Sequence, residues 1–142
     1  MDFIGAPYPI RSNSQGYFYS QKGLSQIKSD LLILLMTEPG ERCMLPQYGT
    51  PLRSLLFEQN DETTAEKARQ LIIDSINMWE PRVTIEQLEV KTGLDDEDLS
   101  IYNEFDNRYE LAHILYVYIR FFDPEDQNEV DELVIELPLS GA

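Results

Sequence analysis

Two segments of the chain carry apolar residues at the spacing of one helix face. The first is marked by Leu24, Ile27, Leu31, Leu34 and Leu35, which predicts a helix over residues 24–36. Further apolar residues at positions 32, 33 and 36 leave its C-terminal half apolar nearly all round, a pattern typical of a helix buried between two layers. Pro39 and Gly40 end the helix, because proline disfavours helical backbone at the preceding residue.

The second helical segment follows a loop over residues 38–51, rich in proline and glycine, and a short helix predicted over Leu52 to Phe57. Its start has the form of a capping box, with Thr63 as N-cap and Glu66 three residues later. Its apolar stripe ends at Trp79, and Pro81 terminates the helix.

Strand patterns begin after Pro81. Val83 and Ile85 alternate with polar residues, and Leu88 and Val90 continue in the opposite phase, which predicts a β-bulge between the two pairs. Residues 93–110 are an acidic connection in which positions 99 and 101 could form a short strand of their own.

The segment from Leu111 to Phe122 is rich in β-branched and aromatic residues and is apolar on both faces, which predicts a central strand. A turn over residues 123–128 leads to a last strand over residues 129–137, which alternates cleanly with Glu132 and Glu136 outward.

Helices that precede an antiparallel meander indicate an α+β fold, with N-terminal helices packed on a small antiparallel sheet. We expect residues 23–142 to form one domain. Residues 1–22 form an extended N-terminal arm that lies against this domain or a neighbour, because the arm carries five apolar anchors: Tyr8, Ile10, Tyr17, Phe18 and Tyr19.

Charge narrows the possible partners. The 142 residues carry 26 acidic and 11 basic side chains, a net charge of −15, which argues against nucleic acid and anionic membranes as partners. A single cysteine, Cys43, excludes an intramolecular disulfide and fits a reducing cytoplasm, and we expect it to be a small, partly buried hydrophobe. Neither a membrane span nor a signal peptide is expected.

No catalytic constellation is visible in the sequence. The single histidine, His113, lies within a strand pattern, and no nucleophile elbow or phosphate-binding glycine loop accompanies it. The acidic run at residues 95–98 lacks the Gly and terminal Glu of a calcium loop. We therefore expect no cofactor, no metal and no catalytic residue, and composition and spacing alone leave the function open.

Two local patterns carry more information. One is Thr37-Glu38-Pro39-Gly40-Glu41-Arg42, continued by Pro46, Tyr48 and Gly49 and a Leu-Leu-Phe-Glu segment at 55–58; the other is Trp79-Glu80-Pro81-Arg82. In this order they resemble the GPW-type baseplate wedge family of contractile-tailed phages, which includes tail-sheath initiators and their equivalents in bacteriocins and type VI secretion baseplates. The resemblance is tight over residues 24–92 and looser over the later strands.

The resemblance implies a structural role rather than an enzymatic one. Members of this family link baseplate wedge proteins to tail sheath subunits in the virion, where the first ring of sheath is built on them. The implied partners are wedge proteins and sheath subunits, with tube or hub proteins as further candidates. The implied assembly is a ring of six copies, formed in the host cytoplasm.

Five candidate partner-binding residues lie in the two patterns. Trp79 and Pro81 create a rigid corner at which Glu80 and Arg82 either brace the domain or contact helical parts of neighbouring baseplate proteins. In the loop, Glu41 and Arg42 follow the Pro-Gly turn and either dock a partner or pack within the domain, with Arg42 pairing a nearby acid.

The last strand is the candidate edge for strand addition, in which an extended sheath arm pairs with exposed backbone groups. Its candidate residues are Val130, Glu132, Val134 and Glu136, and the two glutamates would also deter pairing between free monomers. Two alternatives remain open at this point. One is a cell-wall lysozyme-like enzyme, a label that some family members carry, and the other is a regulatory adaptor of the same fold that binds a response regulator.

Overall fold

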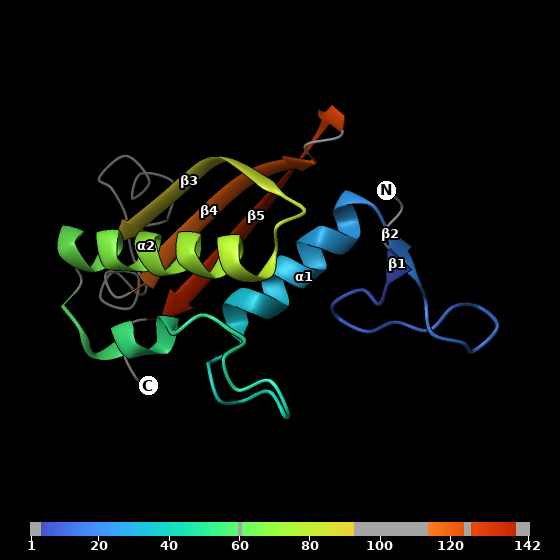
Figure 1. Ribbon diagram of the computed structural model, residues 1–142, viewed down its shortest axis with the longest axis horizontal. Coiled ribbons are helices and arrows are strands. Elements are labelled where there is room, and N and C mark those ends of the chain that lie inside the picture. Colours follow the sequence, from blue (N-terminus) through green and yellow to red (C-terminus); the bar gives the residue numbers. More distant parts are fainter. Residues whose placement is uncertain (1–3, 60, 93–113, 124–125, 139–142) are drawn as a thin grey trace, which may run out of the picture.

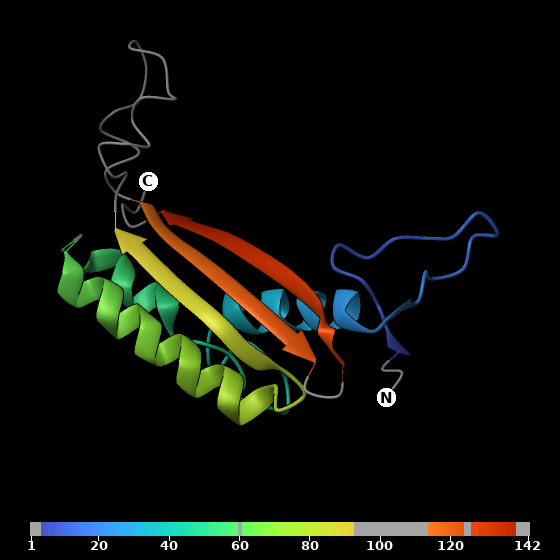
Figure 2. The ribbon, with the colours of Figure 1, turned by 90° about the horizontal axis from the view of Figure 1, so that it is seen from above.

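The computed structural model describes residues 4–59, 61–92, 114–123 and 126–138. Two helices lie side by side on one face of a three-stranded antiparallel sheet, and an N-terminal arm extends from the end of this body (Figures 1 and 2). The α+β prediction is confirmed. Predictions that concern residues 93–110 and His113 fall outside the described residues.

Helix α1 (Leu24–Met36) has the predicted bounds. Its buried stripe includes Ile27 and Leu31, which are fully buried, and each such side chain contributes about 1.5–3 kcal/mol of hydrophobic stabilisation. Burial between two layers is wrong for the rest of the helix, since Ile33 is 36% and Met36 48% exposed. Sheet and second helix cover only one side of α1, so its apolar surplus faces outward.

The 3-10 helix η1 (Leu52–Phe57) also matches its prediction, and α2 (Glu62–Trp79) follows. The predicted N-cap is wrong: the cap is Asp61, whose Oδ1 accepts from the backbone N–H of Thr64 at 2.9 Å. A carboxylate at this position also interacts favourably with the helix dipole, an advantage that the hydroxyl of Thr63 lacks. Thr64 instead donates its hydroxyl to the carbonyl of Gln59 at 2.6 Å.

The main sheet has the order β3-β4-β5, formed by β3 (Thr84–Thr92), β4 (Ile114–Asp123) and β5 (Asp126–Pro138). The predicted bulge is present as a register shift between Ile85 and Gln87. Strand β4 is central, as predicted, and β5 begins three residues earlier than predicted, so the hairpin turn is shorter than predicted.

Both neighbours of β4 keep their apolar residues on the helix-facing side. The core there is built from Leu115, Val117, Ile119 and Phe121 of β4 and from Leu133 and Ile135 of β5. The other face of β4 is only half-buried, because both helices lie on the same side of the sheet (Figure 2).

The arm forms a two-stranded ribbon in which β1 (Ile4–Gly5) pairs with β2 (Gln21–Lys22). One contact to α1 is a hydrogen bond from the backbone N–H of Tyr8 to Ser29 Oγ at 3.2 Å. The loop of the arm extends away from the body (Figures 1 and 2). All five predicted anchors remain exposed, with Phe18 at 82% and Tyr17 at 71%, so they are not buried against this domain.

Candidate interaction surfaces

The corner after α2 is built as the sequence predicts. The backbone N–H of Glu80 caps the helix by donating to the carbonyl of Ile76 at 2.8 Å, and Pro81 then turns the chain toward β3. Trp79 is half-buried against the core and packs edge-on against Tyr48, with 5.4 Å between ring centroids. The corner therefore holds loop 38–51, in which Tyr48 lies.

Arg82 joins three elements through one guanidinium group. It donates to both carboxylate oxygens of Glu80, and its Nη2 donates to Asp30 Oδ2 in α1 at 2.7 Å. The second oxygen of Asp30 accepts from Gln26 Nε2 at 2.8 Å. The Glu80 side chain is only 7% exposed, so Arg82 neutralises a carboxylate that would otherwise be buried without a counter-charge.

These contacts also act on the charge state of the arginine. The hydrogen bonds to Glu80, followed by those to Asp30, raise the pKa of Arg82 above its usual value against the opposing effect of burial. Glu80 and Arg82 thus make the contacts of an intradomain brace. The Arg82 side chain is still 28% exposed, and its role in partner binding stays a prediction.

Loop 38–51 is fastened to the body at its C-terminal end. Gly49 has φ of 124°, and a Cβ atom there would lie 2.3 Å from the carbonyl oxygen of Thr37. The next residue, Thr50, donates its backbone N–H to that same oxygen at 2.9 Å, while Ser75 of α2 donates its hydroxyl to the carbonyl of Gly49 at 3.3 Å. Only glycine fits this close backbone approach.

Glu41 and Arg42 each contact residues of this chain, Glu41 in the loop and in η1 and Arg42 in the loop alone. Glu41 accepts from the backbone N–H of Glu38 and from Arg53 Nη1, both at 3.0 Å. Arg42 does not pair an acid among the described residues; its guanidinium lies over the ring of Tyr48, 4.4 Å from the centroid. Burial is the main reason that the pKa of the Tyr48 hydroxyl is raised, and the positive charge of Arg42 opposes it.

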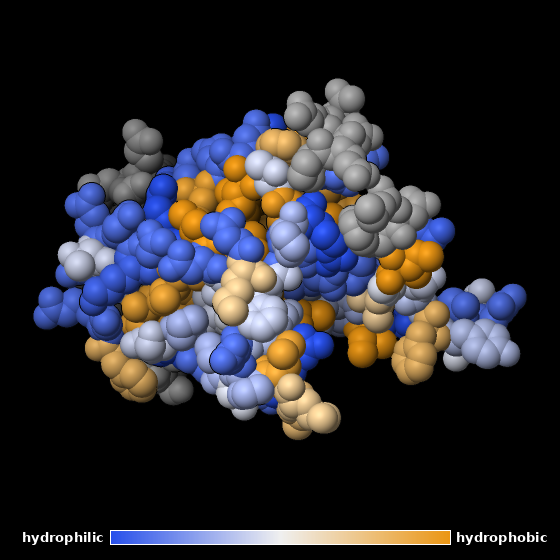
Figure 3. All heavy atoms as spheres, in the orientation of Figure 1, coloured by the Kyte–Doolittle hydropathy of each residue, from blue (hydrophilic) through white to orange (hydrophobic). Residues whose placement is uncertain are grey.

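The tip of the loop presents apolar side chains to solvent. Met44 is fully exposed with φ of 63°, and Phe57 of η1 is 89% exposed. Cys43 is exposed as well, which corrects the expectation of a partly buried residue: the anchors lie at the base of the loop, and its tip has nothing to pack against. Figure 3, which has the orientation of Figure 1, shows hydrophobic residues at the surface along the lower edge of the molecule and on the arm.

Strand β5 is an edge of the described sheet, and its candidate residues face solvent. Val134 is 59% and Val130 40% exposed, and Glu132 and Glu136 are exposed between them. The backbone N–H of Glu132 donates to the side chain of Asp131 at 2.7 Å, which places that N–H on the open edge rather than toward β4. Since N–H groups alternate along a strand, those of Val134 and Glu136 point the same way.

Asp131 also reaches the helix layer. Its Oδ1 accepts from Lys28 Nζ of α1 at 2.8 Å, so one oxygen holds both a helix side chain and an edge N–H. Asp131 shares its phase with buried Leu133, and an inward-pointing charge on an edge strand is a known device against unwanted pairing.

Four residues of these surfaces were missed by sequence reasoning: Lys28, Asp30, Tyr48 as a ring contact, and Asp131. The sequence held a signal for Asp131 alone, because the alternation along the last strand places this charged residue at a position that faces the helices. The partners of Asp30 and Asp131 lie 52 and 103 residues away, and no local pattern identifies them. Within the described residues, no cluster of three or more His, Cys, Asp or Glu could hold a metal, and no helix is long and apolar enough to cross a membrane.

Known proteins resemble this chain in sequence. A family model described as baseplate wedge protein gp25 matches residues 21–113. The baseplate wedge protein gp25 of Enterobacteria phage T4 is 27% identical over 119 residues, which cover 84% of this chain and 78% of that protein.

Three solved structures share the fold. A putative tail lysozyme from Geobacter sulfurreducens has a TM-score of 0.62 at 20% identity and covers 82% of this chain and 91% of its own. A chain of the six-fold symmetrised anti-feeding prophage baseplate has a TM-score of 0.60 at 17% identity, and the match covers 98% of this chain and 87% of that chain. A chain of the postcontracted pyocin R2 baseplate has a TM-score of 0.51 at 19% identity, and the match covers 91% of this chain and 97% of that chain.

Proposed function

Since this chain belongs to the baseplate wedge protein gp25 family, we propose that it joins wedge proteins to the tail sheath in a contractile-tail baseplate and starts sheath assembly. In this role it works as a structural component that offers two separate surfaces. One surface faces the wedge and the other receives the sheath.

The observation that carries the sheath contact is the open edge of β5. Outward N–H groups at Glu132, Val134 and Glu136 are those that an added strand would use. An extended arm from a sheath subunit would pair with them, main-chain hydrogen bonds would provide affinity, and alternating side chains would fix the register. The exposed glutamates at 132 and 136 disfavour pairing between two free copies.

The wedge contact is supported by the loop tip. A non-glycine residue at positive φ is strained, and such strain is found most often where function retains it. Met44 is strained in this way and touches solvent on all sides, while the base of its loop is fixed by Gly49 and Thr50. A strained apolar side chain on a rigid support is well suited to contact a partner, and Arg42 and Glu41 lie beside it.

The relatives support a setting in a tail baseplate, and the details of that setting are part of the proposal. The protein sits in the tail baseplate of the virion or of a related injection machine, is assembled in the host cytoplasm, and occurs as six copies in a ring. The six-fold symmetry of the anti-feeding prophage baseplate supports the ring. Tube or hub proteins are further neighbours in such an assembly.

The enzymatic alternative has weaker support. A putative tail lysozyme shares the fold at 20% identity, which speaks for the fold alone. Glycoside hydrolysis needs a carboxylic acid that can give up a proton opposite a second carboxylate. Among the described residues, the buried acid is Glu80, and it is instead neutralised by Arg82. No observation favours the regulatory adaptor.

A proline scan of the edge tests the sheath contact. Val134→Pro removes an outward N–H and leaves the bonds to β4 in place, so the variant should fold but bind the sheath subunit at least about tenfold more weakly. Val134→Ala keeps the N–H and serves as the matched control with unchanged binding. The partner is the purified sheath subunit of the same contractile tail.

Folding of the variants is checked by circular dichroism before binding is measured. If Val134→Pro is unfolded, Glu136→Pro removes a second outward N–H nearer the end of the strand and replaces it in the test. Sheath binding that survives in a folded proline variant at the strength of the alanine control would refute strand addition at β5.

A further inference from the structure

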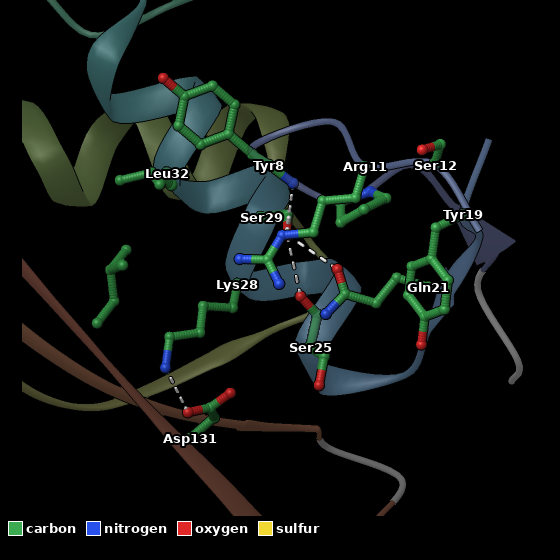
Figure 4. A pocket seen from close by; sticks show the side chains of 12 residues that line it. Tyr8, Arg11, Ser12, Tyr19, Gln21, Ser25, Lys28, Ser29, Leu32 and Asp131 are labelled. Carbon is green, nitrogen blue, oxygen red and sulfur yellow. Dashed lines mark hydrogen bonds and ion pairs between the residues drawn. The ribbon is translucent and has the colours of Figure 1, made fainter. Parts of the chain in front are cut away.

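A groove runs beside the open edge of β5. It has a volume of about 580 Å³ and is lined by the arm, by α1 and by the β5 residues Asp131 and Leu133. Figure 4 shows side chains of the arm and of α1 facing each other across it. The groove therefore lies between the arm, α1 and the helix-facing side of β5, next to the edge of that strand that has no partner in the described sheet.

The groove collects positive charge in a strongly acidic chain. Arg11 of the arm and Lys28 of α1 both line it, and residues 4–22 of the arm include two basic residues and no Asp or Glu. Figure 4 shows the guanidinium of Arg11 extending from the arm over the groove. Within the described part of the chain, Arg11 has no ion pair, so a cation is available for a ligand.

One carboxylate already occupies the rim of this groove. Asp131 Oδ1 accepts from Lys28 Nζ at 2.8 Å and from the outward N–H of Glu132 at 2.7 Å. The ion pair is partly exposed, with side-chain exposures of 41% for Lys28 and 30% for Asp131, so it can exchange partners. The contacts of Asp131 therefore show that the rim of the groove binds a carboxylate. Asp131 also covers the N–H of Glu132, which an incoming strand needs.

We propose that the segment added to β5 carries an acidic residue that replaces Asp131 in this groove; the inference rests on the proposed sheath contact. The incoming carboxylate binds Arg11, whose planar fork matches two carboxylate oxygens, together with Lys28. A main-chain carbonyl of the same segment takes over the N–H of Glu132. The partner segment is thus extended and acidic, and its acid fixes the register.

In the free protein, Asp131 hinders the addition of a strand to β5. It satisfies the outward N–H of Glu132 and neutralises Lys28, so a segment without a suitably placed acid gains nothing by displacing it. The groove therefore selects among strands that could otherwise pair with the same backbone.

Binding of the sheath subunit to the full-length chain tests the inference in three variants. Arg11→Glu should weaken binding about tenfold or more, because it replaces an attractive charge with a repulsive one. Asp131→Ala uncovers the N–H of Glu132 and frees Lys28, and should tighten binding about threefold or more. The control Arg69→Glu makes the same charge change on α2, outside the groove, and should leave binding unchanged.

The outcomes separate this inference from the function on which it rests. If the unaltered chain does not bind the sheath subunit, the proposed function fails. If Val134→Pro abolishes binding while Arg11→Glu binds the sheath subunit as tightly as the control Arg69→Glu does, strand addition stands and the acid-binding groove is refuted. A folded Asp131→Ala variant that binds no more tightly than the unaltered chain would also refute displacement. If Asp131→Ala is unfolded, Asp131→Asn, which keeps an acceptor for Glu132 but loses the charge, replaces it and should bind more tightly.

Discussion

Arg82, in the turn before β3, donates from Nη2 to Asp30 Oδ2 in the middle of α1 over 2.7 Å, and this bond ties together segments 52 residues apart. The same guanidinium neutralises buried Glu80 at the end of α2. One side chain therefore fixes the position of α1 relative to the corner that supports loop 38–51. Placement of the loop, and of the surface on it, depends on this connection.

Removal of the brace should destabilise the domain without unfolding it. Arg82→Ala leaves Glu80 buried without a counter-charge, and we expect the free energy of unfolding to fall by about 2–3 kcal/mol. Urea denaturation of the single variants Arg82→Ala and Asp30→Ala and of the double variant measures the coupling. A double variant whose loss equals the sum of the single losses would show that the two residues do not act together.

The tight approach of Gly49 to Thr37 can be tested with a second glycine as control. Gly40→Ala suffers only the strain of a positive φ, about 1 kcal/mol, because φ is 99° and nothing lies within 4 Å of the new Cβ. Gly49→Ala adds a collision with the carbonyl oxygen of Thr37, so its loss should reach about 3 kcal/mol or more. Equal losses in chemical denaturation would contradict the close approach.

Strain at Met44 predicts a trade between stability and binding. Met44→Gly relieves a positive φ in a side chain with no contacts to lose, so thermal stability should stay equal or rise. Binding to the wedge proteins should weaken, because the apolar tip is gone. Melting curves and co-purification with wedge proteins measure the two effects, and unchanged co-purification would remove Met44 from the wedge contact.

The cap of α2 predicts a pH dependence. The backbone N–H of Thr64 is the main reason that the pKa of Asp61 is lowered in the folded chain. A carboxyl with a lowered pKa stabilises the fold above its unfolded pKa, and this contribution is lost as the pH falls through the folded value. Asp61→Ala should therefore melt below the unaltered chain at pH 7, and the difference should shrink on acidification. A difference that does not change with pH would contradict an ionised cap.

How much of this could be predicted from the sequence depends on the distance over which each feature is encoded. Apolar spacing set the bounds of α1, and alternation with a phase switch located the bulge in β3. The pattern predicted Thr63 as the N-cap of α2, whereas Asp61, two residues earlier, holds that position because its charge adds to its hydrogen bond.

The candidate surfaces were predictable in position but not in contacts. The corner at Glu80 and Arg82 and the β5 edge were both anticipated. The counter-charges Asp30 and Lys28 were not, because each lies in α1 and meets its partner only through tertiary packing. The sequence also suggested that Arg42 pairs an acid, whereas it stacks on Tyr48, a ring that α2 holds in place through Trp79.

The central claim is that β5 receives a strand from the sheath, and a cryo-EM structure of the assembled baseplate–sheath junction tests it most directly. We expect an extended sheath segment paired with the backbone at Glu132, Val134 and Glu136. A junction in which the sheath contacts only helices of this chain, with the edge of β5 left to solvent, would contradict it.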